Sequence, residues 1–296
     1  MKKYAKLLLV VACVAMVFAM SVGVSAANYS DNSAVYTNTA PAASTSVTVT
    51  LNFQSAKVGS SALDESTSVT LTSDTATTFK VVDVLAKFAA DNSDYTLTSV
   101  YWDENWNGTV VPFTSASTNL FGITYNNVTY SPAGVSSLDG WKYRVNTKLP
   151  QQDQWTGSMI NQAYVRNGDV IDFYYDNSTG STEAAARAAA ARFTRIYDVS
   201  YANNTASVTV QQSYDWFLNA SPWTSGIVDF AAYQWAVVVV YNAAGQYVGY
   251  GITDSNGVAS IPNLTDGATY TAVVDCSFGS DNYIDNTGCS FTFVAQ

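Results

Sequence analysis

Histidine is absent from all 296 residues of the sequence. Its absence excludes Ser-His-Asp and Cys-His catalytic arrangements, His-ligated zinc and histidine-based proton shuttles. Cysteine pairs at zinc-ligand spacing, a Gly-rich phosphate loop and a G-x-S-x-G elbow are also missing from the sequence. We therefore predict that the protein is not an enzyme and has neither catalytic residues nor a metal site.

Charged residues are scarce, at 12% of the chain, whereas aromatic residues make up 14% and include 20 tyrosines and 7 tryptophans. Solubility must therefore depend on serine, threonine, asparagine and tyrosine. Tyrosine and tryptophan supply large contact areas at low entropic cost, which favours a binding surface, but aromatic residues also simply suit β-strands. Lysine is absent after Lys148, which excludes Lys-Asn isopeptide bonds within the C-terminal part.

Paired carboxylates, the remaining route to glycan hydrolysis, occur at Asp103 and Glu104, close to Trp102 and Trp106. Adjacent residues of a strand point to opposite faces, so in a strand this pair cannot flank one bond. Solvated surface charge is the favoured interpretation. Asp254 begins an Asp-Ser-Asn-Gly sequence that superficially resembles a calcium loop, but the acid expected two positions earlier is missing. We predict a hairpin turn there.

The first 26 residues have the three-part order of a secretory signal peptide. Lys2, Lys3 and Lys6 precede an uncharged apolar run, 7–20, and a small-residue exit at 24–26. A retained transmembrane helix needs about 20 apolar residues, and this run is shorter. We predict cleavage, a location outside the cell or on its surface, and no membrane insertion afterwards.

The exported chain is strongly acidic. Three of the 13 basic residues and none of the 23 acidic residues leave with the signal peptide, which changes the net charge from −10 to −13. Such a chain repels phosphate groups. Nucleic acid and anionic membranes are therefore not expected partners.

Two cysteines remain after cleavage, because Cys13 lies in the signal peptide. Cys276 and Cys289 fall on strand-like segments, on the apolar side of each, and an even count in an exported protein predicts one disulfide. The alternative is two buried free thiols that act as small apolar groups.

Periodicity predicts a first domain over residues 45–176. It follows a polar N-terminus, 27–44, that we expect to be mobile. Residues 45–53 alternate as a half-buried strand, and 68–72 form a second. Apolar residues then recur at helical spacing between 78 and 92, which predicts one amphipathic helix. Strand, strand, helix and further strands predict an α+β domain in which the helix lies on a mixed sheet.

An alanine-rich helix separates this domain from a second one. Residues 177–195 contain a polar break followed by the favourable i,i+4 pair Glu183 and Arg187. Because this helix lacks a broad apolar face, we interpret it as a semi-rigid linker. Residues 196–296 alternate in short strands separated by turn sequences, which predicts a β-sandwich. The fold class is therefore mainly β, with one α+β domain.

Two sequence motifs in the first domain resemble the family of transcobalamin-like C-terminal domains. The motifs are the Gly-Trp-Lys-Tyr-Arg-Val-Asn segment at 140–146 and the segment 167–175, which runs from Asn-Gly-Asp-Val-Ile into an aromatic strand; residues 77–85 resemble the helix entry of the family. The resemblance covers about residues 45–176 and implies a β-grasp-like fold. It also implies binding of a corrinoid such as cobalamin, which the family holds between this domain and a helical barrel. No such barrel is predicted here.

The second domain resembles carboxypeptidase-regulatory or prealbumin-like modules of secreted bacterial proteins. The similar residues are 237–241, 244–245, 253–257 and 261–264. This resemblance implies an Ig-like or prealbumin-like sandwich with a structural or adhesive role.

We favour a secreted or cell-surface binding protein without enzymatic activity, for a corrinoid or another small ligand. No cofactor is predicted other than cobalamin as a ligand. A structural or adhesive surface protein that binds protein or glycan is the alternative, and a glycan-acting enzyme is the least favoured. Aromatic platforms suit flat ligands, although Trp141 and Tyr143 share a strand face and are also candidates for the core. The predicted contact residues are Trp102, Trp106, Tyr125, Trp141 and Tyr143.

Overall fold

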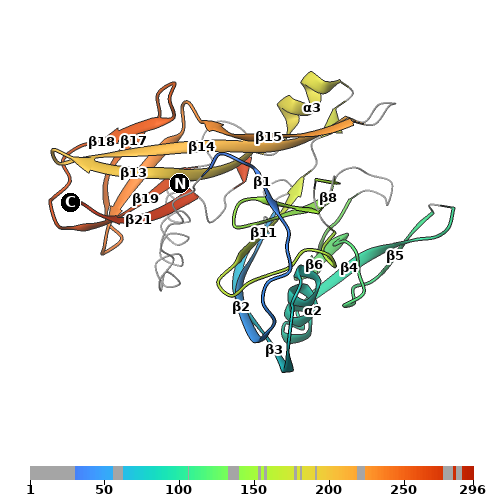
Figure 1. The fold of residues 1–296 in the computed structure, drawn as a ribbon. Helices are drawn as coiled ribbons and strands as arrows, with labels where there is room; N and C mark the ends of the chain where they lie inside the picture. Colours follow the sequence, from blue (N-terminus) through green and yellow to red (C-terminus); the bar gives the residue numbers. More distant parts are fainter. Residues whose placement is uncertain are drawn as a thin grey trace.

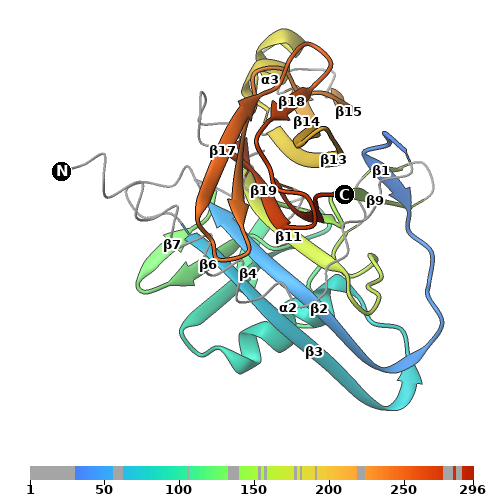
Figure 2. The ribbon, with the colours of Figure 1, turned by 90° about the vertical axis from the view of Figure 1, so that its left-hand side faces the viewer.

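The computed structural model describes most of the chain beyond residue 30. The described residues are 31–55, 63–105, 107–132, 140–152, 155–156, 159–176, 179–180, 182–190, 192–218, 224–275, 283–284 and 289–296. Strands make up 58% of the structure and helices 8%, which confirms the mainly β prediction. The N-terminal and C-terminal strands gather on separate sides of the molecule (Figures 1 and 2).

The N-terminal domain is built on a four-stranded mixed sheet with the order β3-β2-β11-β8. β2 pairs antiparallel with β3 and parallel with β11, which in turn is antiparallel to β8. The alternation predicted for β2 is present, because Val47, Val49, Leu51 and Phe53 are all buried. The strands are β2 (Ser44–Ser55), β3 (Leu63–Thr77), β8 (Gly140–Val145) and β11 (Val170–Asp176).

The predicted helix is α2 (Val81–Asp91), which lies against one face of this sheet (Figure 1). Its first turn is fixed because the Asp83 carboxylate accepts a hydrogen bond from the backbone N–H of Lys80 at 2.8 Å. Its apolar side packs into the core, where the Phe88 ring lies 5.1 Å from that of Phe53.

Two smaller sheets complete this domain. A four-stranded antiparallel sheet has the order β5-β4-β6-β7, and a three-stranded sheet has the order β1-β9-β10. Leu97, Ile123 and Tyr130 of the first join the same core as α2 and β2. The strands are β1 (Val35–Thr37), β4 (Tyr95–Trp102), β5 (Gly108–Pro112), β6 (Gly122–Tyr125), β7 (Val128–Tyr130), β9 (Leu149–Gln152) and β10 (Trp155–Thr156).

Two sheets packed face to face form the C-terminal domain. Ile196, Val208 and Val210 of one sheet meet Val238 and Val240 of the other in a single apolar core. The first sheet contains β12 (Thr179–Gly180), β13 (Arg192–Ala202), β14 (Thr205–Leu218), β15 (Thr224–Ala232), β18 (Val258–Ile261) and β20 (Tyr283–Ile284). The second has the order β17-β16-β19-β21, with β16 (Val237–Asn242), β17 (Tyr247–Ile252), β19 (Thr269–Asp275) and β21 (Ser290–Val294).

The alanine-rich helix α3 (Glu183–Ala189) differs from the expected linker. Ala186 and Ala190 are completely buried and pack with Trp216 of β14. The Arg187 guanidinium also lies over the Trp216 ring, 4.8 Å from its centroid. Small side chains allow the helix backbone to approach the sheet closely, so α3 covers β14 instead of spacing two domains apart.

The N-terminal segment also differs from its prediction. We expected residues 27–44 to be mobile, but residues 35–37 form β1, which runs parallel to β9, and Ala34 is completely buried. Hydrogen bonds to distant residues supply the order that local periodicity did not indicate.

Two predictions concern residues outside the described parts. The predicted signal peptide, 1–26, lies outside the described residues. Neither of the described helices has the length and apolar character needed to cross a membrane. Cys289 is buried, with its Sγ 3.6 Å from the backbone oxygen of Thr194. Cys276 lies outside the described residues, so the disulfide stays a prediction.

Candidate functional site

The five predicted ligand contacts do not gather on one exposed surface among the described residues. Tyr143 is 9% exposed and stacks on Phe173, with 5.3 Å between ring centroids. Trp141 is half-buried, and its Nε1 donates to the backbone oxygen of Tyr130 at 3.0 Å. Both residues therefore belong to the packing of the N-terminal domain.

The other three contacts have different surroundings. Tyr125 stacks on Tyr95 at 4.3 Å. Trp102, at the end of β4, is 39% exposed, on the hairpin of β4 and β5 that extends away from the body in Figure 1. Trp106 lies outside the described residues. The four described residues therefore do not form a common aromatic platform, and Trp102 lies at the end of an exposed hairpin.

Asp103, the candidate acid of a glycan-acting enzyme, has a structural role in the turn of this hairpin. It accepts hydrogen bonds from the backbone N–H of Asn107 at 2.8 Å and of Asn105 at 2.9 Å, and from Asn107 Nδ2 at 3.0 Å. The hydrogen bonds from Asn107 lower the pKa of the Asp103 carboxyl. An acid held ionised in a turn is unsuited to protonating a leaving group.

Asp254 plays the same role in the predicted hairpin turn. Its carboxylate accepts from the backbone N–H of Asn256 at 2.8 Å and of Val258 at 3.0 Å. No group of three or more potential ligands suited to a metal ion occurs within the described parts of the chain.

The most distinctive polar site is the interface between the two domains, where two arginines are completely buried. Arg144 belongs to β8 of the N-terminal domain and Arg195 to β13 of the C-terminal domain. Burying a guanidinium is costly unless its charge is compensated. The neighbours of these two residues therefore define what the interface can do.

Asp215 of β14 supplies the compensating charge across the interface. Its carboxylate accepts from Lys142 Nζ at 2.7 Å and from the Tyr174 hydroxyl at 3.1 Å, and lies 3.6 Å from Arg144 Nη2. Burial of this carboxyl favours its neutral form, but the positive charges of Lys142 and Arg144 outweigh that effect and lower its pKa to about 2. Asp215 is therefore ionised whenever the two domains are joined near neutral pH.

Aromatic rings enclose the two guanidinium groups. Arg195 lies over the Phe230 ring at 3.7 Å and Arg144 over the Phe193 ring at 4.6 Å. Cation–π contacts of this kind strengthen when water is excluded. Arg195 also donates to the Gln211 side chain through Nε at 3.0 Å and Nη2 at 2.8 Å.

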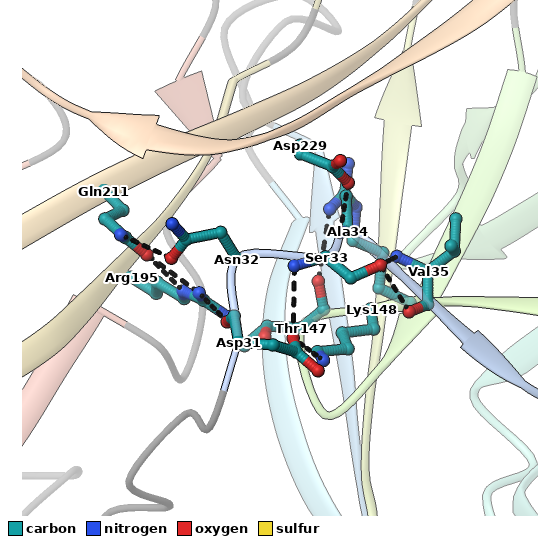
Figure 3. Close-up of polar contacts among 11 residues, drawn as sticks. Asp31, Asn32, Ser33, Ala34, Val35, Thr147, Lys148, Arg195, Gln211 and Asp229 are labelled. Atoms are coloured by element: carbon teal, nitrogen blue, oxygen red, sulfur yellow. Dashed lines mark hydrogen bonds and ion pairs between the residues drawn. The ribbon is translucent and has the colours of Figure 1, made fainter.

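A segment near the N-terminus contacts both domains, and we call residues 31–38 the N-terminal strap. Toward the C-terminal domain, the backbone N–H of Ala34 donates to Asp229 Oδ1 at 2.9 Å, and Asn32 Oδ1 accepts from Gln211 Nε2 at 2.9 Å (Figure 3). Arg195 Nη2 also donates to the Asp31 backbone oxygen at 2.8 Å.

The same strap is held by the N-terminal domain on its other side. The backbone N–H of Leu149 donates to the Ala34 oxygen at 2.9 Å. Lys148 Nζ donates to Asp31 Oδ1 at 2.5 Å (Figure 3). Asn38 ends the strap, where its Oδ1 accepts from the Tyr164 N–H at 3.0 Å. The strap therefore joins the two domains by hydrogen bonds in addition to the covalent connection through α3.

Sequence reasoning overlooked this interface, although one signal was present. Residues 141–145 alternate, so that Lys142 and Arg144 share one face of β8 while Tyr143 and Val145 share the other. A charged face on a strand of an otherwise charge-poor chain indicates a partner for those charges. The partner itself, Asp215, is far away in the sequence and could not be identified from the local pattern.

No family model, curated protein or solved structure matches this chain.

Proposed function

We propose that this protein is an extracytoplasmic structural or adhesive surface protein, without enzymatic activity, in which the two β domains act as one rigid body. The observation that carries the proposal is the closed domain interface. Domains within one chain usually move relative to each other unless their interface is extensive and well packed. Here a network of charges around the completely buried Arg144 and a strap that contacts both domains oppose such motion.

A rigid pair of domains suits a protein that holds a surface in place or transmits force. A small-molecule receptor of the transcobalamin type instead needs an open cleft between two bodies. Here the strand that carries the resemblance, β8, directs Lys142 and Arg144 into the domain interface and Tyr143 into the core. The structural alternative is therefore better supported than corrinoid binding.

The finer fold assignments belong to the same proposal. In the N-terminal domain the first hairpin, the parallel pairing of its first strand with the last strand, and the helix on one face support a β-grasp assignment. Two packed, mostly antiparallel sheets support an Ig-like or prealbumin-like sandwich for the C-terminal domain.

Location and activity test the proposal together. Brief protease treatment of intact producing cells should degrade the protein. The protein recovered from untreated cells should begin after the predicted signal peptide. Beads coated with this exported chain should adhere to the same cells, whereas beads coated with an unrelated acidic protein should not. Recovery of the uncleaved chain from the cytosol, saturable turnover of a glycan panel, or saturable cobalamin binding seen in the corrinoid spectrum would each contradict the proposal.

A further inference from the structure

On the outward side of the sheet made of β16, β17, β19 and β21, the part formed by β16 and β17 is unusually apolar, whereas Thr271 of β19 and Thr292 of β21 form a polar pair with their hydroxyls 2.9 Å apart. Val238, Val240 and Val274 point into the sandwich core, so strand alternation directs their neighbours Val237, Val239 and Val273 outward, where they are half-buried. Tyr250 lies opposite Val239 and Ile252 opposite Val237 in the register. We call Val237, Val239, Tyr250, Ile252 and Val273, together with Trp235, which precedes Val237 by two residues in the chain, the apolar outer face.

The N-terminal domain shows what an ordinary solvent-facing sheet looks like in this chain. On the outward side of β2 and β3, Thr48 lies opposite Thr70 and Thr50 opposite Ser68, and the two threonine hydroxyls of the first pair are 2.9 Å apart. Antiparallel sheets that face water normally carry such polar residues. The apolar outer face departs from this pattern: Tyr250 is 58% and Ile252 51% exposed.

Trp235 is held in a strained backbone conformation although its side chain is exposed. Its φ is 70°, a left-handed conformation that is costly for a bulky residue and that glycine adopts freely. The buried Thr253 fixes it there: the Trp235 N–H donates to the Thr253 oxygen at 3.0 Å, and Thr253 Oγ1 accepts from the Ala236 N–H at 2.8 Å. Trp235 nevertheless remains 70% exposed. Strained residues of this kind concentrate at binding sites.

Charge identifies the class of partner. From residue 196 to the end the sequence has eight aspartates and neither lysine nor arginine. Asp254 follows Ile252 by two residues, and Asp275 lies opposite Val237 at the end of β19, so carboxylates adjoin the apolar outer face. A second copy of this acidic domain, an anionic lipid surface or a nucleic acid would all be repelled. A partner must bring positive charge around an apolar centre.

We propose that the apolar outer face docks a protein partner whose own apolar patch is bordered by lysine and arginine. Aliphatic residues fill the middle of the face, which suits a polypeptide surface better than a sugar ring, and exposed apolar patches with polar rims are typical of protein interaction sites. This partner class rests on the proposed adhesive function, since it names what the surface protein adheres to.

Two designed peptides test whether the docked partner must be positively charged. The exported full chain is titrated with a fluorescent peptide of alternating lysine and valine and, separately, with one of alternating glutamate and valine. Fluorescence anisotropy should show saturable binding of the lysine peptide that weakens as salt rises. Absence of binding, or equal binding of both peptides, would overturn the proposal.

Substitutions on the face separate docking from folding. Trp235→Gly relieves the left-handed backbone, so the variant should unfold at the same temperature as the wild type or higher, yet bind the lysine peptide at least about tenfold more weakly, as is usual for a central interface tryptophan. Ile252→Ser should act in the same direction. Tyr101→Ser is the control, because Tyr101 is 64% exposed but lies in the N-terminal domain.

Each remaining outcome has a definite meaning. Unchanged binding by Trp235→Gly and Ile252→Ser, or an equal loss in Tyr101→Ser, would overturn the docking site. If the protein binds a neutral glycan and both face substitutions abolish that binding, the partner is a sugar and the proposed protein partner is wrong. If the protein self-associates and Ile252→Ser abolishes the self-association, the partner is a second copy of this chain and the proposed basic partner is wrong. Protease removal from intact cells and bead adhesion do not depend on the peptides, so failure here leaves the proposed function separately testable.

Discussion

Replacing Asp215 with asparagine should open the domain interface. The substitution leaves Lys142 and the completely buried Arg144 without their carboxylate. Removing one partner of a buried ion pair typically costs about 3–5 kcal/mol, because the remaining charge stays desolvated. The interface has its own small apolar cluster, Ala34, Tyr174, Phe193 and Phe230, separate from the two domain cores. We therefore expect the domains to separate while each stays folded.

Acid should weaken the same interface in the wild type. The pKa of Asp215 falls from 3.8 to about 2 in the folded protein, so its stabilisation is complete above about pH 4 and is lost as the pH falls toward 2. The shift corresponds to about 2 kcal/mol. Asp215→Asn should lose this dependence, because asparagine does not titrate.

Two measurements follow the opening. Small-angle X-ray scattering should show a larger radius of gyration for Asp215→Asn at pH 7, and for the wild type only near pH 2. Limited proteolysis should cut the variant faster between the domains. Asp198→Asn is the matched control, since Asp198 is exposed on β13 of the same domain and its removal changes the net charge equally. A compact Asp215→Asn variant, or an equal expansion of Asp198→Asn, would refute the reasoning.

Three further predictions concern stability. Removing residues 27–38 should lower the free energy of unfolding by several kcal/mol, at about 0.5–1.5 kcal/mol for each hydrogen bond of the strap, whereas Asp31→Ala should cost less than about 1 kcal/mol because Asp31 is 53% exposed; denaturant titration of both proteins checks this. Gly257→Ala should cost about 1–3 kcal/mol more than Gly267→Ala: both glycines have positive φ, but only at Gly257 would a Cβ meet backbone, 2.5 Å from the Val210 oxygen. Equal losses on thermal unfolding would contradict that difference. Mass spectrometry of unreduced, alkylated protein should find Cys276 and Cys289 joined, a bridge expected to add about 3 kcal/mol, and two alkylated thiols would contradict it.

Local periodicity predicted the elements whose faces are set by burial alone. The alternation at 45–53 and the helical spacing after residue 78 became β2 and α2, because one side of each packs on a core that any compact fold must provide. The same pattern identified the two-sheet C-terminal domain as β throughout. These elements needed no knowledge of distant partners.

Polar contacts between residues far apart in the sequence determine the features that local patterns did not predict. The N-terminal strap has no apolar period, and its order comes from Gln211, Asp229 and Leu149, which are far away in the sequence. Trp141 and Tyr143 were aromatic and therefore attractive as ligand contacts, yet the sheet that surrounds them uses them for packing. In β8 the less conspicuous residues, Lys142 and Arg144, make the contacts between domains.

Charge segregation connects the interface with the apolar outer face. Every lysine and arginine of the exported chain lies at or before Arg195, whereas all the charged side chains after Arg195 are aspartates. Asp215 uses part of that negative charge to bind Lys142 and Arg144 within the molecule. Asp254 and Asp275 border the apolar outer face, so the net negative charge of this part of the molecule favours a partner that carries positive charge. Because salt screens exposed charges far more than buried ones, raising the ionic strength should release the lysine peptide well before it separates the domains.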